Sequence, residues 1–461
     1  MYNSRRDFLK ASGMVVMAGA AGYLGTENFI YGQSATELTD STKAQDAKQR
    51  PTLVTIFLRG GADALNAFVP AGDQMYYQAR TRIALHGDAP TKGKGKGGEA
   101  GVIPIGKSNY WGINHKMAAL LPLMEKGIVV PIMNVGSPNG TRSHFSAQDY
   151  MERGALGDSG ISNGWLNRYL EATKKPYDAP LRGLSAQTLV PRALRGPYPV
   201  LAGNNKTEEM ELFENLYSTK NMVNMNARDG ANDTKGSRLD DLNKGPKAAL
   251  TADSTRDVIA QSGANAIERI KALEKAEQTE NTADYPGGGL SGQLKTIAKV
   301  IKADVGLEVA QADYGGWDHH SGQGGVGGHH AQMLGHLADC LVAFNADLGD
   351  RMNRVMVLVM SEFGRTVQDN GAAGTDHGRA GFMIAMGNML KGNNKVWGVD
   401  KWDMRDLDYG RFLPVHTDFR AVFAESLVRL FHFDPFQGKV FPDYQASPKN
   451  FLNFMKQQAE A

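Results

Sequence analysis

The chain has 461 residues, of which 41% are hydrophobic, so it is long enough for one large or two medium globular domains. Its formal net charge is only +2 at pH 7, which argues against a broad basic surface for nucleic acid. The single cysteine, Cys340, excludes an internal disulfide, and its helical surroundings are typical of a small buried residue.

The first residues, up to about 45, are predicted to be an export signal and a linker. The arginine pair Arg5 and Arg6 precedes an apolar stretch from Ala11 to Leu24. That stretch is shorter than the roughly 20 apolar residues of a membrane span, and no later segment is long and apolar enough to form one. The pattern is typical of a twin-arginine signal, and the alternative is a basic amphipathic helix. We therefore expect a periplasmic or secreted protein that is exported folded by the twin-arginine translocase, without a stable membrane span.

Beyond the linker, short apolar runs alternate with segments of helical spacing. Predicted strands lie at residues 53–58, 127–133, 306–312, 355–360 and 382–386. Predicted helices lie at residues 117–126, 141–152, 289–303 and 329–353. Ser143 is placed near the N-cap of the second of these helices. This alternation predicts an α/β fold with a largely parallel central sheet and helices on both faces.

The middle of the chain differs in composition. Between about 204 and 288 charged and polar residues dominate, and residues 226–247 contain almost no apolar side chains. We interpret this region as a helical and polar insertion in a single domain that covers residues 46–461. A second polar segment, residues 89–100, is of low complexity and predicts a loop.

Several predicted strand ends are followed by acidic residues or histidines. These residues are Asp63, Asp318, His319, His320, Glu362, Asp376 and His377. Ligands of open α/β sheets bind at the carboxyl ends of the strands, where these side chains would gather. Each residue alone could be a turn residue, a helix cap or half of an ion pair. Together, carboxylates and imidazoles favour a site for Zn, Mn or a similar divalent metal, with one or two ions.

Four sequence blocks carry a resemblance to a known family. They are Ser143–Phe145, Gly316–His320, Ser361–Thr366 and Gly374–Gly378. In this order they resemble the signature blocks of the DUF1501 family of exported bacterial proteins, which belongs to the alkaline phosphatase and sulfatase superfamily. The resemblance covers roughly residues 51–435. It implies an alkaline-phosphatase-like α/β fold.

The resemblance also implies roles for individual residues. The implied metal ligands are Asp63, Asp318, His320, Glu362, Asp376 and His377. Ser143 is the implied nucleophile and Thr141 a second candidate, while Arg142 or Arg365 would steady an anionic substrate. Phe363 stands where the superfamily has a metal-binding histidine, so one metal site is expected to be intact and the other incomplete.

These implications lead to two functional hypotheses. The first is a periplasmic metal-dependent hydrolase of phosphate or sulfate esters, which acts on a small anionic substrate through a serine at a helix N-terminus. The second is a non-catalytic metal-binding, glycan-binding or assembly protein on the same fold, and Phe363 is the residue that favours it.

The twin-arginine interpretation predicts the behaviour of a charge-conserving double variant. Replacing Arg5→Lys together with Arg6→Lys should leave unprocessed precursor in the cytoplasm, because the translocase reads the guanidinium pair and not the charge alone. Immunoblots of cytoplasmic and periplasmic fractions measure this. Normal maturation of the double variant in the periplasm would contradict the signal.

Overall fold

The computed structural model describes residues 50–87, 101–157, 160–175, 178–203, 268, 271–402, 404–436, 439–444 and 448–457. The chain divides into two compact units, and the larger comprises Lys43–Asn205 with Ala272–Ala461. The smaller unit, Met1–Thr42 with Lys206–Lys271, is described only at Glu268 and Lys271. The predicted export signal, the loop at 89–100 and most of the predicted insertion lie outside the described residues.

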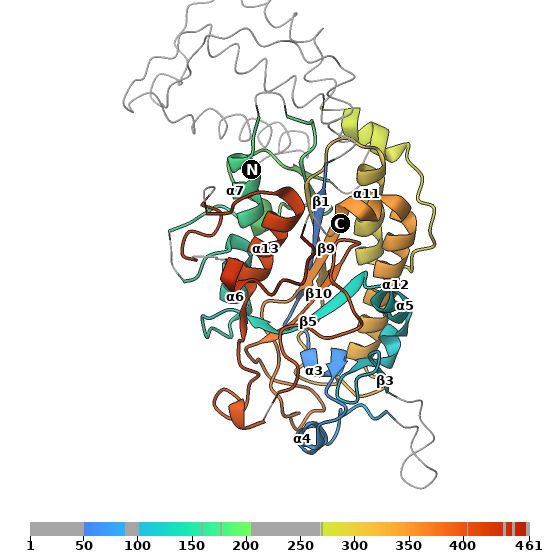
Figure 1. Cartoon of the computed structure of the whole chain (residues 1–461), viewed down its shortest axis with the longest axis vertical. Coiled ribbons are helices and arrows are strands. Elements are labelled where there is room, and N and C mark those ends of the chain that lie inside the picture. The colour runs from blue at the N-terminus through green and yellow to red at the C-terminus, as the bar shows by residue number, and fades with distance from the viewer. Residues whose placement is uncertain are drawn as a thin grey trace, which may run out of the picture. The chain divides into compact units, whose positions relative to one another are not determined.

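The strands and helices of the larger unit alternate along the chain (Figure 1). The strands are β1 (Thr52–Arg59), β2 (Phe68–Val69), β3 (Val102–Pro104), β4 (Gly112–Asn114), β5 (Val129–Gly136), β6 (Gly183–Ser185), β7 (Leu201–Ala202), β8 (Val309–Gly315), β9 (Val355–Met360), β10 (Gly381–Met386) and β11 (Thr417–Asp418). The α-helices are α3 (Ala64–Ala67), α4 (Gln74–Ala79), α5 (Leu121–Glu125), α6 (His144–Arg153), α7 (Trp165–Ala172), α11 (Gly289–Lys302), α12 (His329–Leu348) and α13 (Phe419–Phe431).

Eight strands form the central sheet, in the order β11-β5-β10-β9-β1-β8-β6-β7. All neighbouring pairs are parallel except those of β10, which runs antiparallel to β5 and β9. The start of β10 therefore lies at the same edge as the carboxyl ends of β1, β8 and β9. This edge collects the segments that follow β1, β5, β8 and β9 and the segment that precedes β10. A separate small sheet has the order β2-β4-β3.

Side chains of the central strands alternate between two hydrophobic layers, as the pleat of a strand requires. In β1, Val54, Ile56 and Leu58 belong to one core and Leu53 and Phe57 to the other. The first core includes α11 and α12, and the second includes α6, α7 and α13. In Figure 1 these two helix groups lie on opposite sides of the strands. The predicted α/β class, with a largely parallel sheet between two helix layers, is confirmed.

Most differences from the predicted elements have local causes. The predicted helix at 329–353 ends at Leu348, because Gly349 has a φ of 51°, and a 3-10 turn continues to Arg354. The predicted helix at 117–126 is a 3-10 segment, His115–Leu120, followed by α5, which has Pro122 in its first turn. The strand predicted at 355–360 has those bounds.

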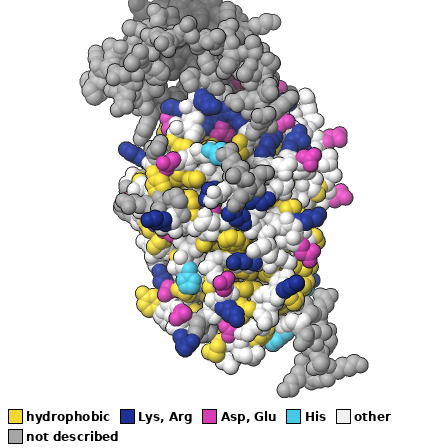
Figure 2. Space-filling view, viewed as in Figure 1, with side chains coloured by type: hydrophobic (Ala, Val, Ile, Leu, Met, Phe, Trp, Pro, Cys, Tyr) yellow, Lys and Arg dark blue, Asp and Glu magenta, His cyan; other side chains and the backbone are white. Residues whose placement is uncertain are grey.

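None of the helices in the described ranges has the length and apolar character that a membrane crossing requires. On the face shown in Figure 2, lysine and arginine side chains are interspersed with aspartate and glutamate. The charged side chains of this face therefore form no extended field of one sign.

The fold brings Gly60, just after β1, into close contact with the loop after β8. Gly60 has a φ of 124°, and a Cβ atom there would lie 2.5 Å from the backbone nitrogen of Asp318. Gly322 also has a positive φ, 62°, but a Cβ atom there would meet nothing within 4 Å.

We therefore expect Gly60→Ala to destabilise the protein by about 3 kcal/mol or more, and Gly322→Ala by only about 1–2 kcal/mol. Gly60→Ala should lose more because it combines backbone strain with a steric clash, whereas Gly322→Ala has the backbone strain alone. Urea unfolding of both variants measures the difference. Equal losses would contradict the close approach of the two loops.

Candidate functional site

Four donor side chains meet at the carboxyl edge of the sheet. Asp318 and His320 follow β8, His377 precedes β10, and His144 begins α6, which follows β5. The ligand atoms of His144, Asp318 and His377 all lie within 4.8 Å of one another. His320 joins them from the other side of His377, with 2.8 Å between the two Nε2 atoms. We call these four residues the histidine cluster.

The distances within the histidine cluster are short. Nε2 of His377 lies 2.9 Å from Nε2 of His144 and 3.3 Å from Oδ1 of Asp318. The other carboxylate oxygen of Asp318, Oδ2, lies 3.3 Å from Nε2 of His144, and Oδ1 lies 3.1 Å from Nε2 of His320. Two ligand atoms on one tetrahedral zinc ion lie about 3.3 Å apart when each bond is about 2.0–2.1 Å. The ligand atoms of His144, Asp318 and His377 are therefore close to the spacing of a metal site, and His320 adjoins this group through His377 and Asp318.

Each histidine of the cluster is held by an oxygen atom at its Nδ1. The partner of His144 is Oε1 of Glu362 at 2.7 Å, and that of His377 is the backbone oxygen of Arg142 at 2.8 Å. His320 faces Oδ1 of Asp376 at 3.3 Å. An acceptor at Nδ1 fixes the proton there and leaves the Nε2 lone pair for a ligand, as in histidines that bind metals.

A divalent cation would make the Nε2 contacts favourable. Two neutral imidazoles that both present Nε2 lone pairs repel each other at 2.8–2.9 Å. If His144 carried a proton on Nε2, it could donate it to the Nε2 lone pair of His377. That one lone pair could not also accept a hydrogen bond from His320. A divalent ion would accept all of these lone pairs together with Asp318. Three imidazoles and one carboxylate are a donor set that fits Zn²⁺ or Mn²⁺.

Protonation of the cluster follows from its neighbours. The hydrogen bond that His144 donates to Glu362 raises the pKa of His144 above its usual value, although burial opposes this. Burial lowers the pKa of His377, and the charge of Arg365 adds to that effect. Burial disfavours the charged form of Asp318, but the hydrogen bond and charge of Arg365 outweigh it and lower the pKa to about 2. Asp318 is therefore a carboxylate at neutral pH.

Glu362 connects the cluster to the buried backbone through hydrogen bonds. Its carboxylate is fully buried and accepts the backbone N–H of Gly60 at 2.9 Å and the side-chain amide of Gln148 at 2.9 Å, besides its bond to His144. Gln148 lies one helical turn after His144 on α6, so both residues face the same way. Burial raises the pKa of Glu362, but the hydrogen bonds from His144 and Gln148 outweigh it, and the pKa is lowered.

Phe363 packs against the rings of the cluster. Its ring centroid lies 4.8 Å from that of His144 and 5.1 Å from that of His377. The residue that cannot bind a metal thus contacts two histidines that can. This aromatic contact restricts the rotation of both imidazoles.

Asp63 lies in a different, buried network. Its Oδ2 accepts from Nη1 of Arg80 at 2.5 Å and from Gln323 at 2.6 Å. Its Oδ1 accepts from Nη2 of Arg80 at 2.9 Å and from the backbone N–H of Leu65 at 3.2 Å, which caps α3. These four bonds use the full acceptor capacity of a carboxylate. The structure therefore places Asp63 in an ion pair with Arg80.

The two arginines that the sequence suggested occupy different environments. Arg365 is buried, and it donates to the carboxylate of Asp318 at 2.6 Å and otherwise to backbone carbonyls. Arg142 is exposed, and its guanidinium lies 5.1 Å from the centroid of the Phe412 ring. Of these two, the exposed guanidinium of Arg142 is the one open to a substrate.

Ser143 and Thr141 lie next to residues that belong to the cluster or contact it. Ser143 is the N-cap of α6, is exposed, and makes no capping hydrogen bond with its side chain. It lies between Arg142, whose carbonyl holds His377, and His144. Thr141 is half-buried, and its hydroxyl accepts the backbone N–H of Ser143 at 3.3 Å.

His144 is a candidate ligand that the sequence patterns did not predict. In the sequence it is only part of the block Ser143–Phe145. The signal that could have found it is its spacing from Gln148, because positions i and i+4 share one face of a helix. A polar pair on the inner face of a helix that starts at the site edge is a clue to a buried polar partner, here Glu362.

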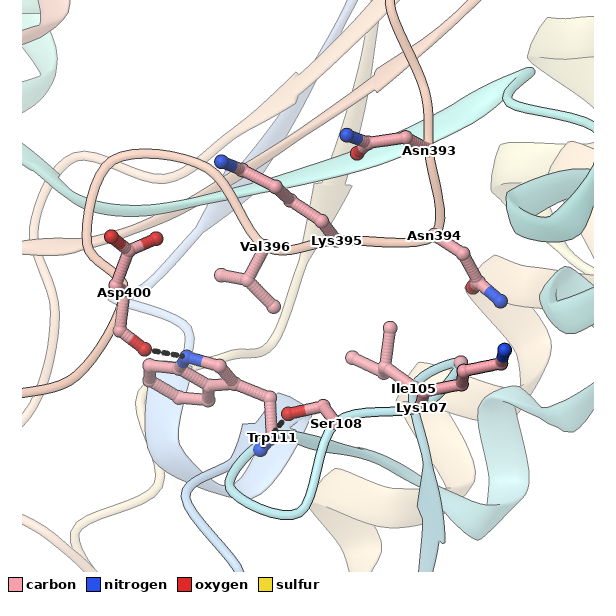
Figure 3. Close-up of a pocket in the computed structure, with 10 residues that line it drawn as sticks. Ile105, Lys107, Ser108, Trp111, Asn393, Asn394, Lys395, Val396 and Asp400 are labelled. Atoms are coloured by element: carbon pink, nitrogen blue, oxygen red, sulfur yellow. Dashed lines mark hydrogen bonds between the residues drawn. The ribbon is translucent and has the colours of Figure 1, made fainter.

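A separate cavity of about 500 Å³ lies between two loops (Figure 3). One loop contributes Lys107 and Trp111, and the other contributes Asn394 and Lys395. The indole N–H of Trp111 donates to the backbone oxygen of Asp400 at 2.7 Å. None of the candidate metal or catalytic residues lines this cavity.

The fold and the site define an α/β protein with a candidate His/Asp/His metal centre at the carboxyl edge of its sheet. The chain belongs to the DUF1501 family, described as a protein of unknown function, whose model matches residues 128–439. No curated protein matches the sequence. Among solved structures, an alkaline phosphatase from the Antarctic bacterium TAB5 is similar at 10% identity, with 74% of this chain and 92% of that chain covered. The TM-score of 0.26 is too low to support an argument about function.

The cluster geometry predicts metal binding that depends on His377. The wild-type protein should bind one equivalent of Zn²⁺ or Mn²⁺, and His377→Ala should lose most of it, because His377 lies between His144 and His320. Affinity should fall as the pH decreases through the raised pKa of His144, since an imidazolium cannot bind a metal.

Elemental analysis and calorimetric titration of the purified protein measure both effects. His432→Asn is the matched control, because His432 caps α13 in a left-handed conformation that asparagine tolerates. Undiminished metal binding by His377→Ala would show that the cluster is not the metal centre.

Proposed function

We propose that the protein is a metal-dependent hydrolase of phosphate or sulfate esters, with Ser143 as the nucleophile. The observation that supports this proposal is the convergence of three imidazoles and Asp318 directly beside an exposed serine at a helix N-terminus. The substrate would be a small anionic ester, and the site would lie in the periplasm or outside the cell after twin-arginine export.

The residues that would hold the metal are His144, Asp318, His320 and His377. These four donors suffice for one ion, and Glu362 and Asp376 would orient two of the histidines through Nδ1. A divalent cation bound there would stabilise negative charge on the ester oxygens and lower the pKa of a nearby hydroxyl group.

Ser143 has the position and freedom that a nucleophile needs. Its hydroxyl is not used for capping, and the residues on both sides of it belong to or contact the cluster. In the reaction its Oγ would form a bond to phosphorus or sulfur while the bond to the alcohol oxygen breaks, and that alcohol takes up a proton. Water would then release the phosphate or sulfate from the serine. The N-terminus of α6, ten residues long, favours the negative charge of the substrate.

Thr141 remains the second candidate for this role. Its hydroxyl accepts a hydrogen bond from the backbone of Ser143 and is less exposed. Arg142 would steady the substrate, because its guanidinium is exposed at the mouth of the site. Arg365 would instead act through Asp318, which it contacts directly.

The second hypothesis, a non-catalytic metal- or glycan-binding or assembly protein, is favoured by the Asp63–Arg80 ion pair. A guanidinium lies where the superfamily resemblance implies a metal, and Phe363 stands where it implies a histidine. Both features leave one metal centre in place of two. A protein that binds metal stoichiometrically but hydrolyses no aryl phosphate or aryl sulfate would support this alternative.

The hydrolase proposal predicts a sharp separation of metal binding from turnover. Ser143→Ala should keep the metal and the melting temperature but lower kcat/KM for 4-nitrophenyl phosphate or sulfate by more than about 10³-fold, because it removes the nucleophile and no ligand. Ser146→Ala, one turn along α6, is the matched control and should retain activity. If Ser143→Ala were as active as wild type, Ser143 would not be the nucleophile. Thr141 would then be the nucleophile, or the reaction would not proceed through a covalent intermediate.

A further inference from the structure

A tight turn beside the histidine cluster displays an arginine. The backbone N–H of Asp408 donates to the oxygen of Phe412 at 3.0 Å, and the N–H of Phe412 donates back at 3.1 Å. Tyr409 and Gly410, at the tip, have φ angles of 55° and 62°. The carbonyl of Arg411 accepts the N–H of Val367 at 2.9 Å. The backbone of the turn is therefore fixed to the segment that follows Arg365.

Two guanidinium groups converge on one ring of this turn. The guanidinium of Arg411 lies 5.5 Å from the centroid of Phe412, and that of Arg142 lies 5.1 Å from it. Phe412 is buried, whereas the side chain of Arg411 is 55% exposed. The aromatic ring attracts both cations, so each guanidinium lies within cation–π distance of the same side chain.

The positive charge of this pair is only partly balanced. Among the described residues, Arg411 makes one ion pair, to Oδ2 of Asp376 at 3.8 Å, and Arg142 makes none. The carboxylate of Asp376 already accepts from Asn370 and faces His320 at Oδ1. Within the described part of the chain, Asp376 is thus the one carboxylate that pairs with either of these exposed guanidinium groups, an arrangement that an anion would stabilise.

The arginine pair lies on the outer side of the cluster. Arg411 contacts the carboxylate oxygen of Asp376 that points away from His320, so the carboxylate and the imidazole ring separate it from Nε2 of His320. A group bound at the Nε2 atoms cannot at the same time be the group that Arg411 binds. The two positions suit two different parts of one ligand.

We propose that Arg411 and Arg142 form a second anion-binding subsite for a phosphate, sulfate or carboxylate group. Resting on the proposed hydrolase function, this assigns the substrate class: a small ester that carries a further anionic group besides the one that is cleaved. The backbone of Arg142 is tied to the cluster, because its carbonyl oxygen lies 2.8 Å from Nδ1 of His377.

The test compares two series of non-hydrolysable ligands by calorimetry, with the metal-loaded protein. Alkylphosphonates of three to six carbons carry one anionic group, and ω-phosphonocarboxylates of the same lengths carry two. At the favoured length, wild type should bind the carboxylated ligand about tenfold more tightly, as one charge-assisted contact provides. Arg411→Gln should abolish this preference and leave alkylphosphonate affinity unchanged, and Arg411→Lys should retain part of it.

Arg195→Gln, which removes an exposed arginine elsewhere, is the control for net charge and should keep the preference. Arg142→Gln should lower it as Arg411→Gln does. No preference in wild type at any length, or a preference that survives both glutamine variants, would overturn the subsite. A preference that depends on Arg411 in a protein without esterase activity would keep the subsite and reject the hydrolase proposal instead.

Discussion

The geometry of the site depends on the buried guanidinium of Arg365. This one group bonds the carboxylate of Asp318 and four backbone carbonyls, those of Gly60, Gly61, Trp317 and Thr375. It thereby joins the segments after β1 and β8 to the segment before β10. Four buried carbonyls and the partly exposed carboxylate of Asp318 would lose their donor if it were removed, and unpaired buried polar groups are costly. The planar fork of arginine suits this task in a way that the single ammonium of lysine does not.

The antiparallel direction of β10 has an equally direct consequence for the histidines. Because β10 starts at the edge where β8 and β9 end, His377 reaches the same place as Asp318 without a long connection. The oxygen partners of the three imidazoles come from three different segments: the loop after β9, the segment before α6 and the segment before β10. The ring orientations are thus set by oxygen partners that the fold supplies, which is the condition for a preorganised centre.

Sequence patterns could predict the layers of the fold but not all of the site. The apolar run at 355–360 predicted β9, because a strand that is buried on both faces consists of an almost continuous run of apolar residues. Short edge strands such as β7 and β11, two residues each, carry no periodicity and were not predicted. Among site residues, Asp318, His320 and His377 were predicted as neighbours and lie together. His144 was not predicted as a ligand, because its partners lie more than 200 residues away and its only local signal is the polar pair that it forms with Gln148 on one face of α6.

In the ion pair of Asp63 and Arg80, a guanidinium group balances the charge of a buried carboxylate. Asp63 caps α3 and is buried, so its carboxylate requires a cation, and Arg80 supplies one together with two hydrogen bonds. The pKa of Asp63 is lowered although burial opposes ionisation, which means that the pair outweighs desolvation. A fixed guanidinium balances charge but offers no open coordination position. A metal would therefore find its open donors at the histidine cluster and not at Asp63.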